Sequence, residues 1–278
     1  MATPTPSQEM NFYDIAMRQP IANNCAAVNP WKSRLALNFK NVPYSTTWVP
    51  LPEIAQVRRG LGMEPCRKFA DGTGFYTLPI LVDPNTGSKV GDSFDIAVYL
   101  QAKYPNAGAG DLFPPQQLDF VFKTDGPLLV PLSDRTVGEH DEYSKFNEQV
   151  DAAFTSHTIL MGYYLPFDPA HAEASRAEFL RRAGMDSWEA FNVQGEAREK
   201  VLESFRVMLG DLGKLFLRDP SGPFLLGQKA SYADLIVGGW LRMARATLPK
   251  NEWEELKSWH GGIFGRLHDS LDKYAEVK

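Results

Sequence analysis

The tripeptide Thr77-Leu78-Pro79 stands at the head of a short apolar run, ILVD, at residues 80–83. Proline has no N–H to donate to a neighbouring strand, so a proline that opens a strand needs a particular reason. One such reason is a cis peptide bond, which would leave the N–H and C=O of Leu78 free to pair with an extended peptide. The alternative is an ordinary edge-strand proline, and this tripeptide by itself favours neither interpretation.

The pair Asp92-Ser93 directly precedes the helical pattern FDIAVYL. The start of a helix attracts anions through its free N–H groups and its dipole, and the Ser93 hydroxyl adds a donor for a carboxylate. Asp92 could pair with an ammonium group nearby. One end of a γ-glutamyl group presents both charges, so the pair predicts a site for such a group. A plain helix N-cap is the alternative, and in isolation the commoner one.

The segment Ala26-Ala27-Val28-Asn29-Pro30-Trp31-Lys32 leads into a further helical pattern. Asn29 is expected to cap this helix, with Pro30 in a position that tolerates proline. The helix start would face a thiol held by the two features above. A free thiol has a pKa of about 8.5, and a helix N-terminus lowers it. The segment therefore predicts activation of a bound thiol.

Composition excludes several other functions. The two cysteines, Cys25 and Cys66, form no C-x-x-C pair and no disulfide framework, so a reducing, cytoplasmic compartment is expected. The net charge of −5 argues against nucleic acid as a partner. No apolar run reaches the roughly 18 residues of a membrane span, and residues 1–8 lack the apolar middle of a signal peptide. The histidines show no metal-binding spacing, and no metal is expected.

Periodicity predicts that these features lie on an α/β unit. Trp31, Leu35 and Phe39 recur at helical spacing, and YSTTWV is rich in β-formers. The expected order is βαβ followed by ββα: a strand at 9–18, a helix at 31–40, a strand at 44–49, a short helix near 54–61, a hairpin at 75–83 and 89–92, and a helix at 93–103.

The second part of the chain is expected to be helical throughout. Ser231-Tyr232-Ala233-Asp234 forms a capping box before an apolar helix, a feature that serves folding. The expected domains are residues 1–105, a linker at 106–115 and an all-helical domain at 116–278. The expected helices lie at 116–134, 138–163, 171–184, 187–218, 231–247 and 251–276.

These features, in this order, resemble the glutathione transferases over essentially the whole chain. Three segments, NPWKSRLALNFKNVPYSTTWV, FYTLPILVDP and DSFDIAVYLQAKYP, resemble the fungal etherase-like (FuA) class, related to bacterial β-etherases. The resemblance implies a thioredoxin-like first domain, a cis bond at Pro79, a thiol-activating residue just before Trp31, glutathione as cosubstrate, phenolic or wood-derived ligands and a homodimer. The expected glutathione contacts are Leu78, Pro79, Asp92, Ser93, Trp31, Lys32 and Lys68.

The chain departs from that class at the expected thiol-activating serine, because Ala27 stands in its place. Alanine has no hydroxyl to donate to a thiolate. Activation would then depend on the main-chain N–H groups of Ala27 and Val28, the Asn29 side chain and the helix dipole, and activity could be weak. Cys25 offers another chemistry, exchange with glutathione through a mixed disulfide, although a lone cysteine is more often a packed small hydrophobe.

The acceptor pocket is expected between the two domains. Segment 164–195 is expected to lengthen the helical domain and to shape the pocket mouth. The predicted function is transfer of glutathione to hydrophobic aromatic or phenolic electrophiles, with etherase or peroxidase side activity. The alternatives are a ligandin, which only binds plant or wood phenolics, and a relative without ligand. The candidate pocket residues are Met17, Ile21, Phe120, Phe122, Phe154, Tyr163 and Tyr164.

Overall fold

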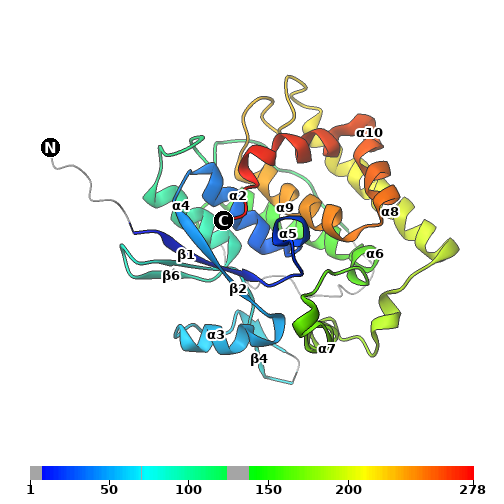
Figure 1. The fold of residues 1–278 in the computed structure, drawn as a ribbon. Coiled ribbons are helices and arrows are strands. Elements are labelled where there is room, and N and C mark those ends of the chain that lie inside the picture. Colours follow the sequence, from blue (N-terminus) through cyan, green and yellow to red (C-terminus); the bar gives the residue numbers. More distant parts are fainter. Residues whose placement is uncertain (1–7, 70, 124–137) are drawn as a thin grey trace.

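The computed structural model describes residues 8–69, 71–123 and 138–278. A small sheet and its covering helices occupy one side of the molecule, and a larger group of helices occupies the other (Figure 1). The expected fold class, a thioredoxin-like domain followed by a helical domain, is confirmed. None of the helices in these described ranges is long and apolar enough to cross a membrane.

The sheet has four strands in the order β2-β1-β5-β6. Strands β1 and β2 are parallel, with Met10 opposite Tyr44, whereas β5 runs antiparallel to both β1 and β6. This mixed order confirms the expected βαβ and ββα units. The bounds of the strands are β1 Met10–Ile15, β2 Tyr44–Val49, β5 Ile80–Asp83 and β6 Ser88–Val90.

Helices and a small ribbon complete the first part of the chain. The expected hairpin strand at 75–83 is interrupted, because residues 74–75 pair with 67–68 in a separate two-stranded ribbon. The remaining elements are α1 Ile21–Asn24, α2 Val28–Phe39, a 3-10 turn at Leu51–Glu53, α3 Ile54–Gly60, β3 Arg67–Lys68, β4 Gly74–Phe75 and α4 Ser93–Lys103.

Helix α2 begins earlier than the sequence predicts. The expectation that Asn29 caps it is wrong, because Ala27 is the N-cap and makes no side-chain hydrogen bond. The main-chain N–H of Trp31 donates to the carbonyl of Ala27 at 3.0 Å, and the Trp31 indole N–H donates to the carbonyl of Cys25 at 2.7 Å. Asn29 and Pro30 therefore lie inside the first turn, where proline loses no hydrogen bond.

Helices form the second part. Residues 116–123 of the expected helix at 116–134 are not helical, and its remainder lies outside the described residues. From residue 138 onward the described chain contains helices, 3-10 turns and isolated bridges but no strand. The helices are α5 Asp141–Thr155, α6 Ile159–Gly162, α7 Ala172–Ala183, α8 Gly195–Phe216, α9 Tyr232–Thr247 and α10 Lys250–Ser270, with 3-10 turns at Pro169–His171, Trp188–Phe191 and Asp272–Tyr274.

The capping box at the start of α9 is confirmed. The main-chain N–H and the hydroxyl of Ser231 both donate to Asp234, at 2.7 and 2.9 Å, and the other carboxylate oxygen accepts from the N–H of Leu225 at 2.8 Å. Almost every residue of α9 is buried, because the helix runs through the middle of the helical domain and also packs on α2.

Two consecutive glycines allow α9 to approach α2 closely. A Cβ atom on Gly239 would lie 2.9 Å from Cγ of Lys32 and 3.0 Å from the carbonyl oxygen of Val28. A Cβ atom on Gly238 would overlap Cδ1 of Leu271 and lie 3.3 Å from Cδ1 of Leu35 on α2. These distances are shorter than ordinary carbon contacts, so a larger residue would push the helices apart.

Candidate functional site

A cleft of about 260 Å³ lies where the first domain meets the helical domain. The starts of α2 and α4, the chain at Thr77 and Leu78, helices α5 and α9, and the segment around α7 all contribute to it. The lining residues that matter below are Met17, Ala27, Val28, Asn29, Cys66, Arg67, Leu78, Asp92, Ser93, Asn147, Asp151, Phe167, Phe179, Arg182, Phe191, Trp240 and Met243.

The main chain at Leu78 is available to a ligand. The peptide bond between Leu78 and Pro79 is cis. Of the two interpretations of Pro79, the cis bond is therefore confirmed. Strand β5 starts only at Ile80, and the main-chain groups of Leu78 make no hydrogen bond to any described residue. Leu78 is largely buried, and it lines the cleft. An extended peptide could therefore pair with it.

The start of α4 presents an acid and a hydroxyl to the same cleft. Asp92 is the N-cap, and its carboxylate accepts from the main-chain N–H groups of Phe94 and Asp95, at 2.8 and 3.2 Å. The N-cap interpretation of Asp92 is therefore confirmed, and Asp92 also lines the cleft, where binding of a γ-glutamyl group stays a prediction. Burial and then the nearby charge of Asp95 raise the pKa of Asp92 above its usual 3.8. Ser93 is 4% exposed.

The start of α2 supplies main-chain N–H groups. Ala27, Val28 and Asn29 all line the cleft, as the sequence predicts. The first intrahelical bond belongs to Trp31, so the N–H groups of Val28 and Asn29 have no helical acceptor. The Asn29 side chain is exposed. A thiolate in the cleft would meet these groups and the positive end of the helix dipole.

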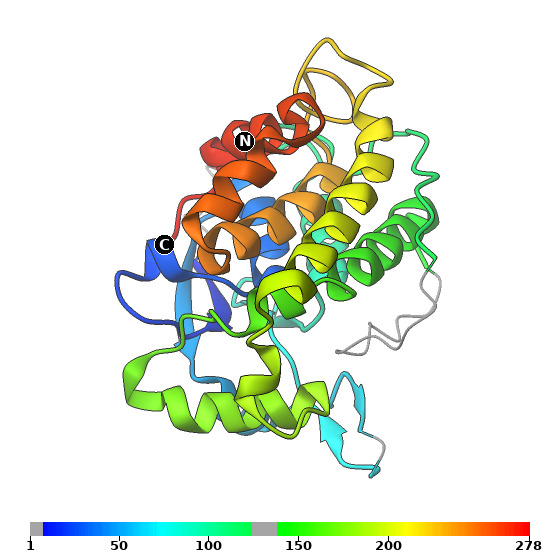
Figure 2. The same cartoon turned by 90° about the vertical axis from the view of Figure 1, so that its right-hand side faces the viewer.

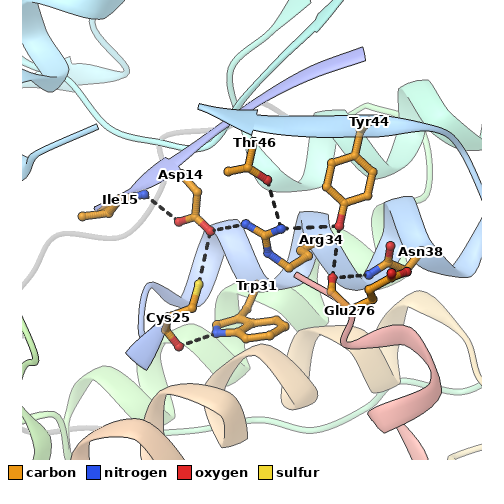
Figure 3. A network of polar contacts seen from close by, with 9 residues as sticks. All are labelled: Asp14, Ile15, Cys25, Trp31, Arg34, Asn38, Tyr44, Thr46 and Glu276. Atoms are coloured by element: carbon orange, nitrogen blue, oxygen red, sulfur yellow. Dashed lines mark hydrogen bonds and ion pairs between the residues drawn. The ribbon is translucent and has the colours of Figure 1, made fainter. Parts of the chain in front are cut away.

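Cys25 faces away from the cleft. Its thiol is 3.3 Å from a carboxylate oxygen of Asp14, which also accepts from the Arg34 guanidinium at 2.8 Å (Figure 3). Burial, and after it the charge of Asp14, raise the pKa of the Cys25 thiol well above its usual value. A buried protonated thiol is a poor nucleophile, so this arrangement does not favour the mixed-disulfide chemistry.

The Cys25 network continues through Arg34 to the C-terminal segment. The Arg34 guanidinium donates to the Thr46 hydroxyl at 3.1 Å and to that of Tyr44 at 3.4 Å, and Tyr44 donates to the carbonyl of Glu276 at 3.2 Å (Figure 3). Aromatic rings surround the guanidinium, with those of Phe12 and Trp48 centred 5.1 Å from it. The network is thus a buried support behind the start of α2.

The cations expected to bind glutathione are placed differently. Lys32 is fully buried and its ammonium contacts Asp151 and Asn147, so it does not line the cleft. Lys68 is exposed on β3 and lies outside the lining as well. Arg67 and Arg182 line the cleft instead. No local pattern marks Arg182, because α7 brings it in from the second domain.

The expected acceptor residues separate into two groups. Met17 lines the cleft, whereas Phe154 is fully buried and stacks on Trp240 with ring centroids 5.2 Å apart. Tyr163 and Tyr164 pack against each other, with centroids 5.4 Å apart. None of the other six expected residues lines the cleft: Ile21, Phe120, Phe122, Phe154, Tyr163 and Tyr164.

An aromatic wall, formed by Phe167, Phe179, Trp188 and Phe191, closes one side of the cleft. Neighbouring rings lie 5.4 to 6.3 Å apart, and Phe167, Phe179 and Phe191 line the cleft directly. The wall comes from segment 164–195. Its helix α7 lies beside the β3–β4 ribbon (Figure 2), where Arg181 lies 4.0 Å from the centre of the Phe69 ring. The segment therefore reaches back to the first domain.

The comparisons with known proteins agree with this geometry. The model of the glutathione S-transferase N-terminal domain matches residues 28–103, and that of the C-terminal domain matches residues 144–274.

Within the described residues, no group of three His, Cys, Asp or Glu side chains could hold a metal ion.

Several solved and curated proteins are similar along their full length. Glutathione S-transferase CsGST63524 of Ceriporiopsis subvermispora, solved with glutathione, is 30% identical, with 98% of this chain and 99% of that chain covered and a TM-score of 0.79. GSTFuA2 of Phanerochaete chrysosporium is 25% identical over 98% and 100%, with a TM-score of 0.76. The glutathione S-transferase-like protein ustS of Aspergillus flavus is 26% identical over 99% and 94%. This chain belongs to the glutathione S-transferase family and resembles its fungal GSTFuA members.

Proposed function

We propose that this protein transfers glutathione to hydrophobic aromatic or phenolic electrophiles. The observation that supports this most is that the start of α2, the start of α4 and the unpaired main chain of Leu78 border one cleft. In the reaction, the glutathione thiol loses its proton to solvent, its sulfur forms a bond to the electrophilic carbon, and the leaving group departs with its electron pair. Holding both reactants side by side supplies much of the rate.

Glutathione would lie across the cleft in an extended conformation. Its cysteinyl main chain would pair with Leu78, and its γ-glutamyl end would reach Asp92 and Ser93. The glycyl carboxylate would lie toward Arg67 and Arg182, which the cleft offers in place of Lys68. Pairing of a carboxylate with a guanidinium is among the stronger polar contacts.

The thiolate would be stabilised by main-chain N–H groups at the start of α2 and by the Asn29 side chain. Ala27 supplies no hydroxyl, and loss of one such donor costs roughly 10²–10³ in rate when it acts in the transition state. We therefore expect slow conjugation.

The acceptor would lie against the aromatic wall. Its rings favour flat, apolar molecules, because aromatic side chains bind other rings by stacking and by edge contacts. Aryl ethers fit the same description, as do organic peroxides that carry an aryl ring, and both are proposed substrates of side activities.

Conjugation of glutathione to chlorodinitrobenzene, followed by absorbance, tests the proposal. We expect a rate above the uncatalysed background that Ser93→Ala lowers through a higher KM for glutathione. A rate equal to background at saturating glutathione would contradict it.

A ligandin is the second candidate function, because Ala27 removes a catalytic hydroxyl while the aromatic wall is retained. It predicts micromolar binding of aromatic ligands without turnover, measured by quenching of tryptophan fluorescence.

We further propose the domain division 1–105, 106–115 and 116–278, a cytoplasmic location and a homodimer. Analytical ultracentrifugation tests the homodimer.

A further inference from the structure

Asp151, on α5, lines the cleft between the two domains. One of its carboxylate oxygens accepts from the Lys32 ammonium at 2.5 Å and from the Trp240 indole N–H at 2.7 Å. The other oxygen accepts from the amide of Asn147 at 3.2 Å. Three donors from three helices hold the carboxylate in one orientation, and its second oxygen keeps room for a further donor.

Only the acidic member of this ion pair faces the cleft. The Lys32 side chain is 0% exposed, whereas that of Asp151 is 15% exposed. Asp151 lines the cleft together with Asp92 and Ser93, and Lys32 does not. A ligand in the cleft therefore meets the carboxylate and not its counter-ion.

Asp151 and Asp92 are close enough for both carboxylates to act on the same side chain, that of Tyr232. The Tyr232 hydroxyl donates to the carbonyl of Ser93 at 3.0 Å. Burial, followed by the charges of Asp92 and Asp151, raises the pKa of the Tyr232 phenol well above its usual value. Asp95 adds a further negative charge beside Asp92. The Lys32 ammonium offsets only one of these three negative charges. The carboxylates together therefore attract an added cation.

The same end of the cleft holds a hydroxyl at the start of α4. Ser93 is 4% exposed and lines the cleft beside Asp92. It lies beside an N-terminal turn that attracts anions. The site thus combines a hydroxyl at a helix start with two carboxylates, those of Asp92 and Asp151. A molecule that carries a carboxylate and an ammonium on one carbon matches this site, with its carboxylate at the helix start and its ammonium at the negative charges.

We propose that Asp151 binds the α-ammonium of the γ-glutamyl group of glutathione. The helical domain of the same chain thereby completes a site that begins on α4, and discriminates glutathione from thiols without an amino group. This assignment rests on the proposed glutathione site and adds a residue from outside the thioredoxin-like domain.

The test compares glutathione with its deamino analogue, N-glutaryl-cysteinylglycine, by titration calorimetry at pH 7. The proteins are the wild type, Asp151→Asn and the control Asp141→Asn, which makes the same change at an exposed position of α5. Loss of a hydrogen bond between charged groups should weaken glutathione binding to Asp151→Asn by about tenfold or more. Binding of the analogue should change by less than about twofold, since it lacks the ammonium.

The outcomes separate the assignment from the proposed function. If the wild type binds neither ligand, both are overturned. If it binds glutathione but Asp151→Asn weakens both ligands equally, or neither, the assignment alone is overturned. If Asp151→Asn does not fold because Lys32 loses its counter-ion, Lys32→Met with Asp151→Asn is measured instead, with the same expectation. Asp141→Asn should bind both ligands as the wild type does.

Discussion

The ammonium of Lys32 lies 2.5 Å from a carboxylate oxygen of Asp151, 119 positions further along the chain. The pair joins α2, which covers the sheet, to α5 of the helical domain. Lys32 is fully buried, and the amide oxygen of Asn147 accepts its second hydrogen bond at 2.8 Å. A buried charge is strongly destabilising when its partner is removed. This contact therefore contributes to the stability of the interface between the two domains, beside the cleft.

The first prediction concerns that coupling. Lys32→Met removes the ammonium and leaves Asp151 without its counter-ion, so we expect a loss of about 3–5 kcal/mol in the free energy of unfolding. Lys32→Met combined with Asp151→Leu should lose less than Lys32→Met alone, because no charge is then left unpaired. Urea denaturation followed by circular dichroism measures both. Lys200→Met breaks an exposed pair with Glu196 and should change stability by less than about 1 kcal/mol. Equal losses for Lys32→Met and Lys200→Met would contradict the prediction.

The second prediction concerns Ala27, the uncapped start of α2. Ala27→Ser should stabilise the protein by about 1 kcal/mol, because a serine N-cap accepts from an N–H group of the first turn. If the new hydroxyl also reaches the glutathione sulfur, kcat should rise by roughly 10²–10³. Thermal unfolding and conjugation kinetics measure the two effects separately.

Ala22→Ser is the matched control for this substitution. Ala22 is exposed on α1 and does not line the cleft, so stability should stay within about 0.5 kcal/mol and kcat should not change. A stabilised Ala27→Ser protein with unchanged kcat would show that the hydroxyl caps the helix without contacting the sulfur.

The third prediction separates the two cysteines by reactivity. Iodoacetamide should modify Cys66, which is exposed and lines the cleft, and should spare Cys25, which is 3% exposed with a raised pKa. Peptide mass spectrometry locates the label, and unfolding in guanidinium should make both thiols reactive. Bound glutathione should slow labelling of Cys66. Rapid labelling of Cys25 in the native protein would contradict the burial of its thiol behind α2.

The fourth prediction is a pH dependence of glutathione binding. The pKa of Asp92 is raised above 3.8, mainly by burial, so Asp92 takes up its proton at a higher pH than an exposed aspartate. Protonated Asp92 no longer attracts an ammonium, and the dissociation constant of glutathione should rise as the pH falls through that raised value. Calorimetry at a series of pH values from neutrality downward measures the change. Asp92→Asn keeps a capping side chain and should flatten the profile.

The linkage to stability has the opposite sign. Because the folded protein binds this proton more tightly than the unfolded chain, the stabilising contribution of Asp92 is fully present below pH 3.8 and is lost as the pH rises through the raised pKa. On acidification, affinity for glutathione should therefore fall while the contribution of Asp92 to stability grows. An unfolding free energy whose pH dependence is the same in wild type and Asp92→Asn would contradict this.

Local patterns in the sequence predict the four strands of the larger sheet and most helices, but not the β3–β4 ribbon. Strand β2 occupies the expected residues 44–49, and the capping box at Ser231 starts α9 as expected. The start of α2 is missed because no side chain caps it. The Trp31 indole holds the preceding loop in place instead, a contact that spacing does not reveal.

The sequence predicts those lining residues of the cleft that belong to a short local motif. Leu78, Asp92 and Ser93 belong to such segments and line it as expected. Arg182 and the aromatic wall come from segment 164–195, which crosses back to the first domain. This contact between distant parts of the chain leaves no local pattern in the sequence. The direction of the Lys32 side chain depends in turn on Asp151, which the sequence places more than a hundred residues away.

The paired glycines of α9 bear on how such proteins can recombine. A chimera that joins this thioredoxin-like domain to the helical domain of a relative inherits a new surface opposite α2. Any side chain larger than hydrogen at the position of Gly239 would meet the backbone at Val28 and the stem of Lys32. A helical domain that carries a larger residue at this position is therefore expected to dock poorly on this α2, whatever the rest of its sequence.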